Sequence, residues 1–336
     1  MKLISFAVPC YNSEAYMRKC IDSLLKAGED AEILIVLDGS VKDNTAAIAD
    51  EYEAKYPTIC RAIHQQNKGH GGACNAGMQN ATGEYFKVVD SDDWLDENAL
   101  AEYMKLLRGL RGQVDLFITN YVYEKQGRKN KMVMRFHDIC PAGRLFAWKD
   151  VRTYRVGEVL TMHTMTYRTQ LLRDCGLVLP EHTFYVDNIY AYLPLAFVKT
   201  LYYADLDLYR YFIGRTDQSV NQEIMVKRQD QQMRVMRAMI EGCHVDALQD
   251  ERLKRYLARD LEMIMTITSV VMIVDGGEAA LKKKDEIWAL LREKNPEADR
   301  RIRRGILGFC CSSRNPLLMK FTMFVYILCQ RIYGFN

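Results

Sequence analysis

The stretch from Phe86 to Leu95, FKVVDSDDWL, is the most informative part of the sequence for the fold. An apolar run that leads directly into acidic residues is typical of a strand buried on both faces, with a polar site at its carboxyl end. Asp90 and Asp92 are separated by one residue, so on an extended strand end both carboxylates point to the same side. Such carboxylates favour Mg²⁺ or Mn²⁺. The alternative is that Asp92 or Asp93 only caps the following helix.

Outward from this stretch, short apolar runs alternate with helical patterns over residues 1–120. The predicted strands are 3–8, 32–37, 58–63, 84–89 and 114–119. The predicted helices are one between a capping Ser13 and a terminating Gly28, followed by 44–55, 72–80 and 97–107. This alternation predicts a Rossmann-like α/β fold with a doubly wound, mostly parallel sheet. Ligands of such sheets bind beyond the carboxyl ends of the strands.

The remainder of the chain changes character twice. Residues 120–211 are mixed, with predicted strands at 132–136, 200–204 and 208–212 and predicted helices at 169–175 and 188–197. After Gly214, helical patterns at 222–243, 246–274 and 278–294 contain almost no Gly or Pro and predict an α-helical C-terminal region. The predicted domains are a catalytic domain at 1–220, with halves 1–110 and 111–220, a helical region at 221–299 and a basic amphipathic tail at 300–336.

Composition excludes several classes of protein. The 336 residues are 49% hydrophobic with a formal net charge of +3, which fits a folded protein and argues against a nucleic-acid partner. The ten cysteines are scattered without a Cys-x-x-Cys pair, so we expect reduced thiols rather than a disulfide framework. The N-terminus is predicted to be a strand and not a secretion signal, which favours a cytoplasmic location.

The tail has a composition of its own. Residues 300–336 carry seven basic residues and no acidic one. The apolar stretch 317–329 reaches only about 20 Å as a helix, short of the roughly 30 Å hydrocarbon core. We expect peripheral contact with an anionic membrane at its inner face. The alternative is that these apolar residues pack on the catalytic domain or on another subunit of a homo-oligomer.

Two further segments have the composition of binding loops. In Leu37-Asp38-Gly39-Ser40, an acid at the end of a strand is placed where a parallel sheet holds a nucleotide base or ribose. Its alternative is a simple Asp turn. The Gly-rich segment 67–72, NKGHGG, would let backbone N–H groups approach an anion before a helix. It matches neither the dinucleotide fingerprint nor the phosphate loop of ATPases.

Together, these segments resemble the family 2 glycosyltransferases of the GT-A fold. The segments are VPCYN at 8–12, LDGS at 37–40, NKGHGGACNAG at 67–77 and GEYFKVVDSDDWL at 83–95. The resemblance implies inverting transfer of a sugar from a nucleotide diphosphate donor, usually a UDP-sugar. It also implies a bound Mn²⁺ or Mg²⁺.

The resemblance assigns roles to individual residues. The donor-binding residues would be Pro9, Tyr11, Asn12, Asp38, Lys68, Gly69, Asp90, Ser91 and Arg215. Pro9, Tyr11 and Asn12 would line the nucleotide pocket, and Asp38 would hold the uracil or ribose. Asp90 and Asp92 match the family's Asp-x-Asp element and would hold the metal. The role of Arg215 does not come from the resemblance but from its place after the strand predicted at 208–212, where it would close over the phosphates as part of a loop. Its alternative is a solvated basic turn.

An inverting displacement requires a base opposite the leaving diphosphate. The segment 179–188, LPEHTFYVDN, resembles the part of the family that carries this base, and the matching residue is Asp187. The alternative is that Asp187 caps the helix predicted at 188–197. His163 and His182 show no metal-ligand spacing and are interpreted as structural.

The sequence therefore predicts an inverting, metal-dependent glycosyltransferase. It would move a sugar from a UDP-sugar to a hydroxyl of a glycan or lipid-linked acceptor, with one addition per encounter. One alternative is a nucleotidyltransferase, although the arginine- and lysine-rich glycine loop expected of that class is missing near the N-terminus. The other is a catalytically silent sugar-nucleotide-binding or scaffold protein.

Overall fold

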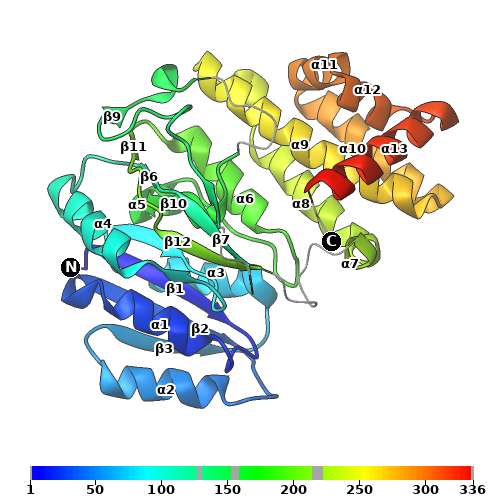
Figure 1. Ribbon diagram of the computed structural model, residues 1–336. Helices are drawn as coiled ribbons and strands as arrows, with labels where there is room; N and C mark the ends of the chain where they lie inside the picture. Colours follow the sequence, from blue (N-terminus) through cyan, green and yellow to red (C-terminus); the bar gives the residue numbers. More distant parts are fainter. Residues whose placement is uncertain (1, 126, 128–130, 153–158, 214–221, 334–336) are drawn as a thin grey trace. The chain divides into compact units, whose positions relative to one another are not determined.

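The computed structural model describes residues 2–125, 127, 131–152, 159–213 and 222–333, without the side chains of 222–223 and 329–333. The chain divides into an α/β unit, residues 1–152 and 160–214, and a helical unit, residues 153–159 and 215–336 (Figure 1). Residues 300–336, predicted as a separate tail, belong to the helical unit.

The α/β unit is built on an eight-stranded sheet with the order β3-β2-β1-β4-β10-β6-β11-β9. The strands are β1 Ile4–Cys10, β2 Ala31–Asp38, β3 Cys60–Gln65, β4 Tyr85–Val88, β6 Leu116–Ile118, β9 Leu145–Phe146, β10 Met165–Arg168 and β11 Leu201–Tyr203. The first four strands run parallel, whereas β10 is antiparallel to both neighbours. The predicted α/β fold is confirmed, but β10 and β9 were not predicted.

The helices of this unit alternate with its strands. They are α1 Met17–Leu25, α2 Thr45–Lys55, α3 Gly69–Asn80, α4 Glu97–Gly109, α5 Thr169–Asp174 and α6 Asp187–Tyr192, and a 3-10 helix, η4 Leu193–Phe197, follows α6. Strand order reverses after β3, so right-handed crossovers place α1 and α2 on one face and α3 on the other. The reversal separates the carboxyl ends of β1 and β4 and creates the crevice in which such sheets bind ligands.

Burial of β1 and β2 explains their sequence. Every residue of both strands is buried, and the register runs from Ile4 opposite Ala31 to Cys10 opposite Leu37. Fully burying one large aliphatic side chain stabilises a fold by about 1.5–3 kcal/mol, so these continuous apolar runs hold the centre of the sheet. Gly77 lets α3 approach closely, because a Cβ there would lie 2.6 Å from the Cβ of Ala7.

The start of α1 differs from the prediction. The side chain of Ser13 does not cap the helix, whose N-cap residue is Tyr16. Instead, the Ser13 carbonyl accepts hydrogen bonds from the backbone N–H groups of Tyr16 and Met17, at 2.9 and 3.0 Å. Gly28 has a φ of +73° and begins a short 3-10 turn three residues after α1 ends. The serine hydroxyl is therefore available for another contact.

A small second sheet begins directly after the acidic stretch. Its order is β5-β12-β7-β8, with β5 Trp94–Leu95, β12 Tyr209–Ile213, β7 Tyr121–Lys125 and β8 Met132–Met134. The ladder between β5 and β12 is antiparallel, and that between β12 and β7 is parallel. This sheet brings Tyr209 to the carboxyl end of β4, where its hydroxyl lies 3.2 Å from the backbone nitrogen of Asp90.

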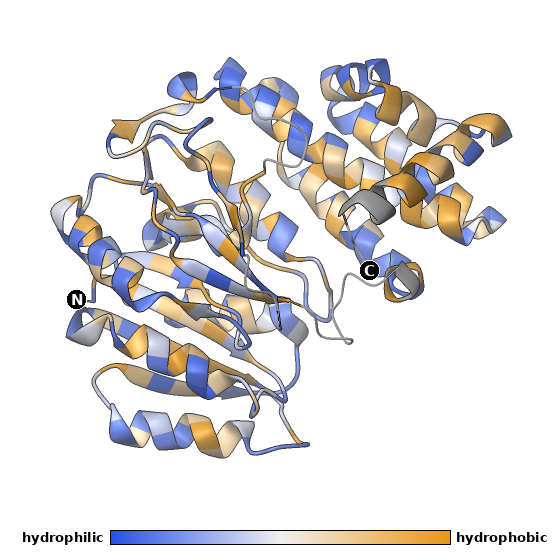
Figure 2. Ribbon diagram, in the orientation of Figure 1, coloured by the Kyte–Doolittle hydropathy of each residue, from blue (hydrophilic) through white to orange (hydrophobic). Residues whose placement is uncertain are grey.

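The helical unit consists of amphipathic helices (Figure 2). They are α7 Gln222–Lys227, α8 Gln229–Gly242, α9 Glu251–Asp275, α10 Glu278–Lys294, α11 Pro296–Arg304, α12 Ile306–Ser312 and α13 Pro316–Tyr333. Asp250 caps α9 by accepting from the backbone N–H groups of Arg252 and Leu253, and Gly276, at φ +70°, follows its end. Across the described part of the chain, every helix is too short or too polar to cross a lipid bilayer.

Candidate active site

The loops that follow β1 and β4 meet at the crevice. The hydroxyl oxygens of Ser13 and Ser91 lie 2.8 Å apart, although the two residues are far apart in sequence. The thiol of Cys20 donates to the backbone carbonyl of Asp90 at 3.6 Å. These contacts join the acidic stretch to the segment predicted to line the nucleotide pocket.

Asp90 is held between two histidines. Nε2 of His70, on α3, lies 2.9 Å from Oδ1 of Asp90, and Nε2 of His163 lies 3.7 Å from Oδ2. Burial would raise the pKa of Asp90, but hydrogen bonds from His163 and His70 hold this pKa well below its usual range. Asp90 is therefore an anion at neutral pH, as a metal ligand must be.

Asp90, Asp93 and His163 form a compact group of metal-ligand atoms. One side-chain atom from each of the three lies within 4.8 Å of the other two. Two ligands about 2.1 Å from one ion lie about 3–4 Å apart, so these three atoms approach the spacing that a single ion requires. Carboxylate oxygens with one imidazole nitrogen suit Mn²⁺. The group contains Asp90 but, unlike the predicted pair, it does not contain Asp92.

Asp93 is the most buried acid of the stretch, at 1% exposure. Its carboxylate accepts the Tyr209 hydroxyl at 2.6 Å and the backbone N–H of Phe212 at 2.7 Å. Burial raises the pKa of Asp93 well above its usual value, and the charges of Asp90 and Asp92 raise it further. Asp93 thus ties the acidic stretch to β12, and Asp92 lies close enough to act on it electrostatically.

Asp96, and neither Asp92 nor Asp93, caps the helix that follows. The Asp96 carboxylate accepts the backbone N–H of Ala99 at 3.1 Å at the start of α4. The alternative that Asp92 or Asp93 only caps this helix is therefore wrong.

Lys87 fixes the turn that carries His163. Its ammonium donates to the backbone carbonyls of His163, at 2.6 Å, and Met165, at 3.2 Å. Burial lowers the pKa of Lys87 to about 7. The His163 ring packs against Tyr209 and Tyr211, with centroids 4.9 and 4.5 Å apart. A histidine held this firmly is oriented by its surroundings rather than by solvent.

The predicted nucleotide loop is exposed in part. Tyr11 is 50% exposed, whereas Pro9 lies inside β1 and is buried. Asn12 has a left-handed φ of +50°, and its backbone N–H donates to the Ser40 hydroxyl at 2.9 Å. Its side-chain oxygen is buried and has no hydrogen-bond partner among the described residues. An acceptor left without a partner at this edge is a group that a ligand can satisfy.

Asp38 lies at the end of β2 and is 3% exposed. Its Oδ1 accepts the side-chain amide of Gln65 and the backbone N–H of Lys68, both at 2.8 Å. The Lys68 ammonium lies 3.1 Å from the carboxylate of Glu181. These contacts join Asp38, Lys68 and Gly69 to the segment that leads to Asp187.

Asp187 is the first residue of α6. Val186 occupies the N-cap position, so the alternative that Asp187 caps this helix is wrong. Burial raises the pKa of Asp187; electrostatic interactions with His163 and His70 oppose this rise, and the charge of Asp90 adds to it. The fold thus brings Asp187 into the electrostatic environment of Asp90, far away along the chain.

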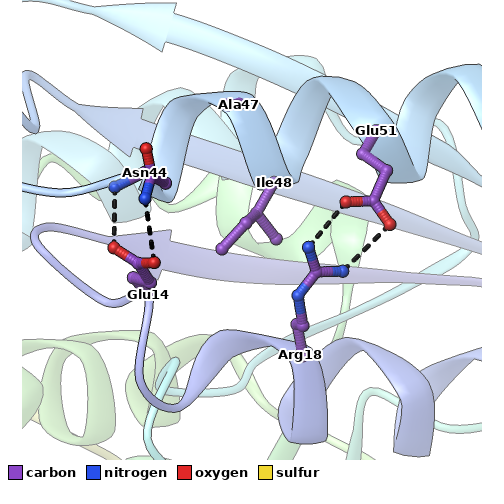
Figure 3. Close-up of a pocket in the computed structure, with 6 residues that line it drawn as sticks. All are labelled: Glu14, Arg18, Asn44, Ala47, Ile48 and Glu51. Atoms are coloured by element: carbon purple, nitrogen blue, oxygen red, sulfur yellow. Dashed lines mark hydrogen bonds and ion pairs between the residues drawn. The ribbon is translucent and has the colours of Figure 1, made fainter.

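Two surface hollows lie elsewhere in the α/β unit. One, of about 380 Å³, lies between α1 and α2 (Figure 3). Its polar side chains are bonded to one another: the Arg18 guanidinium donates to both oxygens of Glu51, at 3.0 and 2.6 Å, and Glu14 accepts from the backbone and side-chain nitrogens of Asn44. The other, of about 330 Å³, is lined in part by Asn75 and Val178. Neither hollow contains a predicted site residue.

Some predictions were incomplete, and one lies outside the described residues. Arg215 belongs to the segment 214–221, which the structure does not describe. His70, His163, Asp93 and Tyr209 were not predicted as site residues. His70 stands within the Gly-rich motif and could have been considered with it, whereas no local pattern distinguishes His163 from a structural histidine.

Comparisons with known proteins agree with the α/β fold described above. The sequence profile of glycosyl transferase family 2 matches residues 5–174, half of the chain. The chain belongs to this family.

Two relatives and one solved structure show the extent of the likeness. GlyG, a glycosyltransferase of Streptococcus pneumoniae, is 37% identical over 142 residues, which are 41% of this chain and 46% of that protein. Chondroitin synthase of Escherichia coli is 33% identical over 126 residues, 37% of this chain and 18% of that protein. The chain spans less than half the length of the curated relatives it matches.

The structural likeness extends further along the chain. Residues 1–349 of TarS from S. aureus, in complex with UDP-GlcNAc, superpose with a TM-score of 0.68. The superposition covers 93% of this chain and 88% of that chain at 20% identity. At this identity the likeness establishes the GT-A-like fold.

Proposed function

We propose that the protein is an inverting, metal-dependent and non-processive glycosyltransferase. It would move a sugar from a UDP-sugar to a hydroxyl of a glycan or lipid-linked acceptor. The observation that carries this proposal is the grouping of Asp90, Asp93 and His163 after the carboxyl end of β4, with Asp187 near enough for the charge of Asp90 to raise its pKa. A metal-dependent inverting transfer needs both a metal-binding acid and a base at one site.

The donor would bind at the crevice between β1 and β4. Asn12 offers its unpaired side-chain oxygen, Tyr11 an exposed ring, and Asp38 a carboxylate at the end of β2. Lys68, Gly69 and Ser91 would complete the donor site. The UDP and UDP-GlcNAc complexes of TarS, whose fold is similar, support a UDP-sugar as the donor class.

Asp90 and Asp92 would hold Mn²⁺ or Mg²⁺, and the grouping of Asp90 with Asp93 and His163 supports a metal at this place. The bound ion would neutralise the charge that develops on the departing diphosphate. The role of Asp93 would be to keep the acidic stretch in register with β12, since both of its oxygens already accept hydrogen bonds.

Asp187 would act as the general base. It would accept the proton of the acceptor hydroxyl as that oxygen forms its bond to the anomeric carbon. The bond from this carbon to the diphosphate breaks at the same time, and UDP leaves with the electron pair. Burial raises the pKa of Asp187, which brings the carboxylate closer to the basicity that proton abstraction at neutral pH requires.

Donor binding and transfer are tested separately. Calorimetry with UDP-sugars and Mn²⁺ should show metal-dependent binding, both in the native protein and in Asp187→Asn. Transfer to acceptor by Asp187→Asn should fall by about 10²–10⁴-fold. Near-native transfer by this variant would contradict the role of the base. Absence of both transfer and donor hydrolysis would favour the catalytically silent sugar-nucleotide-binding or scaffold protein, and nucleotide transfer would favour the nucleotidyltransferase.

The proposal includes contact between residues 300–336 and an anionic membrane at its inner face. On α13, the exposed residues Leu317, Phe321, Phe324 and Leu328 recur at helical spacing and form one apolar stripe. On α12, Ile306 and Phe309 are 73% and 56% exposed. A stripe of this kind, exposed beside cations, is typical of a helix that lies in a lipid interface.

The charges of the same region fit this partner in part. Of its seven cations, Arg303 pairs with Asp299 at 2.7 Å and Arg314 with Asp285 at 2.6 Å. Four others are exposed and make no ion pair with a described residue: Arg300, Arg301, Arg304 and Lys320. Each cation near an anionic surface contributes about 1 kcal/mol.

Vesicle sedimentation tests this contact. The native protein should sediment with vesicles that contain phosphatidylglycerol and far less with pure phosphatidylcholine. Phe321→Glu with Phe324→Glu should abolish the difference, and Val178→Glu, at an exposed apolar residue of the α/β unit, should retain it. Equal sedimentation of all variants would exclude the membrane. A smaller particle for the double variant in light scattering would favour the alternative of a homo-oligomer.

A further inference from the structure

Helix α3 and its N-cap residue, Lys68, hold the segment that leads to Asp187. The Asn75 side chain makes two hydrogen bonds to the backbone of Leu179: its amide donates to the carbonyl at 2.8 Å, and its oxygen accepts the N–H at 2.9 Å. The backbone N–H of His182 donates to the carbonyl of Lys68 at 2.7 Å. Three hydrogen bonds therefore hold residues 179–182 against α3 and its N-cap residue.

Glycine permits this approach. A Cβ at Gly71 would lie 2.4 Å from the backbone oxygen of Pro180, closer than any side chain tolerates. A Cβ at Gly69, whose φ is +74°, would lie 3.0 Å from the backbone nitrogen of His182. The small residues of the motif therefore make room for a protein segment. Close packing against Pro180 is enough to explain why residue 71 is a glycine, without the predicted approach of an anion.

The segment that leads to Asp187 also contains two residues with an unusual backbone conformation. His182 and Tyr185 have left-handed φ values of +48° and +65°, which residues with a Cβ rarely adopt. Such conformations persist only where the surrounding contacts hold them. The contacts to α3 supply this restraint on one side of Tyr185, and α6, which begins at Asp187, follows on the other.

Lys68 also connects this segment to the residues proposed to bind the donor. The backbone N–H of Lys68, whose carbonyl binds His182, donates to Asp38 at 2.8 Å. One short segment of the chain therefore contacts both the predicted nucleotide ligand Asp38 and the segment that leads to the base. A shift of this segment would move the base relative to the donor.

We infer that Asn75 and Gly71 are positioning residues that place the Asp187 carboxylate within reach of the acceptor hydroxyl. This inference rests on the proposed role of Asp187. Neither residue is assigned a contact with donor or acceptor. A displacement of about 1 Å at a reacting group can cost about 10²-fold in rate, so a small relaxation of residues 179–186 is enough to impair transfer.

The test compares two variants with matched controls. Asn75→Ala removes both hydrogen bonds to Leu179, and Gln79→Ala, exposed on the same helix, is its control. Gly71→Ala places a Cβ against Pro180, and Gly109→Ala, with nothing within 4 Å, is its control. We expect kcat for transfer to fall about 10- to 100-fold in the first member of each pair, with Kd for the UDP-sugar within about twofold of native.

A double-variant cycle with Asp187→Asn decides whether the effect passes through the base. In the Asp187→Asn background, Asn75→Ala should cause no further loss, because the group it positions is already absent. An undiminished second loss would overturn the inference, as would native kcat in Asn75→Ala or an equal loss of donor affinity. Near-native transfer by Asp187→Asn alone would instead show that the proposed base is wrong.

Discussion

One buried acid from each unit, Asp115 and Asp260, shows two different conditions for burying a carboxyl group. In the α/β unit, Asp115 accepts from the Arg168 guanidinium at 2.9 Å and from the backbone N–H groups of Lys199 and Thr200, at 2.9 and 3.0 Å. In the helical unit, Asp260 on α9 is 5% exposed, and burial alone raises its pKa to about 7. The partners of Asp115 hold backbone in place, whereas Asp260 makes its unit less stable when it ionises.

The units also differ in the apolar residues they expose. Large exposed apolar side chains in the α/β unit are mainly isolated, as at Val41 and Val178. In the helical unit they concentrate on α12 and α13. The difference indicates that the helical unit presents an apolar surface on α12 and α13. In the α/β unit, the notable feature is instead the group of acids and histidines at the carboxyl end of β4.

The largest expected effect is the loss of transfer on changing Asp90, which follows the carboxyl end of β4. Asp90→Asn should lower transfer by about 10³-fold, because it removes the anion that two histidines and the proposed metal share. Initial rates with saturating UDP-sugar and Mn²⁺ measure this loss, and Asp174→Asn, at an exposed acid on α5, is the control. A native rate in Asp90→Asn would show that this acid is not part of a catalytic site in the α/β unit.

The next effect concerns Asp260, a buried acid of the helical unit. Between about pH 4 and pH 7, Asp260 is protonated in the folded state and ionised in the unfolded state, so the free energy of unfolding falls as pH rises. Above pH 7 this penalty reaches up to about 4 kcal/mol. Asp260→Asn should therefore raise Tm more at pH 8 than at pH 5, as measured by calorimetry. An equal change at both pH values would show that Asp260 is not the titrating group.

The smallest effect concerns the apolar stripe. Phe324 is 64% exposed, so Phe324→Ser should change the free energy of unfolding by less than about 0.5 kcal/mol. Phe117→Ala, at a fully buried ring of β6, should cost about 3–5 kcal/mol in the same denaturant titration. A large loss for Phe324→Ser would mean that the stripe is covered by protein, which would sharpen the case for a homo-oligomer.

Local sequence patterns predicted much of the α/β unit. Continuous apolar runs marked β1, β2 and β4, since a strand covered on both faces buries every side chain. The four-residue strand β10 was missed because it is too short to show a period, and β9 is shorter still. Asp90 was predicted from its place after β4, whereas the contribution of Asp93 depends on Tyr209, a distant partner.

What the sequence by itself determined is the class of fold, the family and the position of the acidic edge. These follow from periodicity and from residues that are neighbours along the chain, and both are visible without coordinates. Only the tertiary structure decided that His163 joins Asp90, that Ser13 binds Ser91 instead of capping α1, and that glycines of α3 make room for the segment before Asp187. The physical reason is that these contacts join segments distant in sequence, so they exist only once the sheet has set the distance between them.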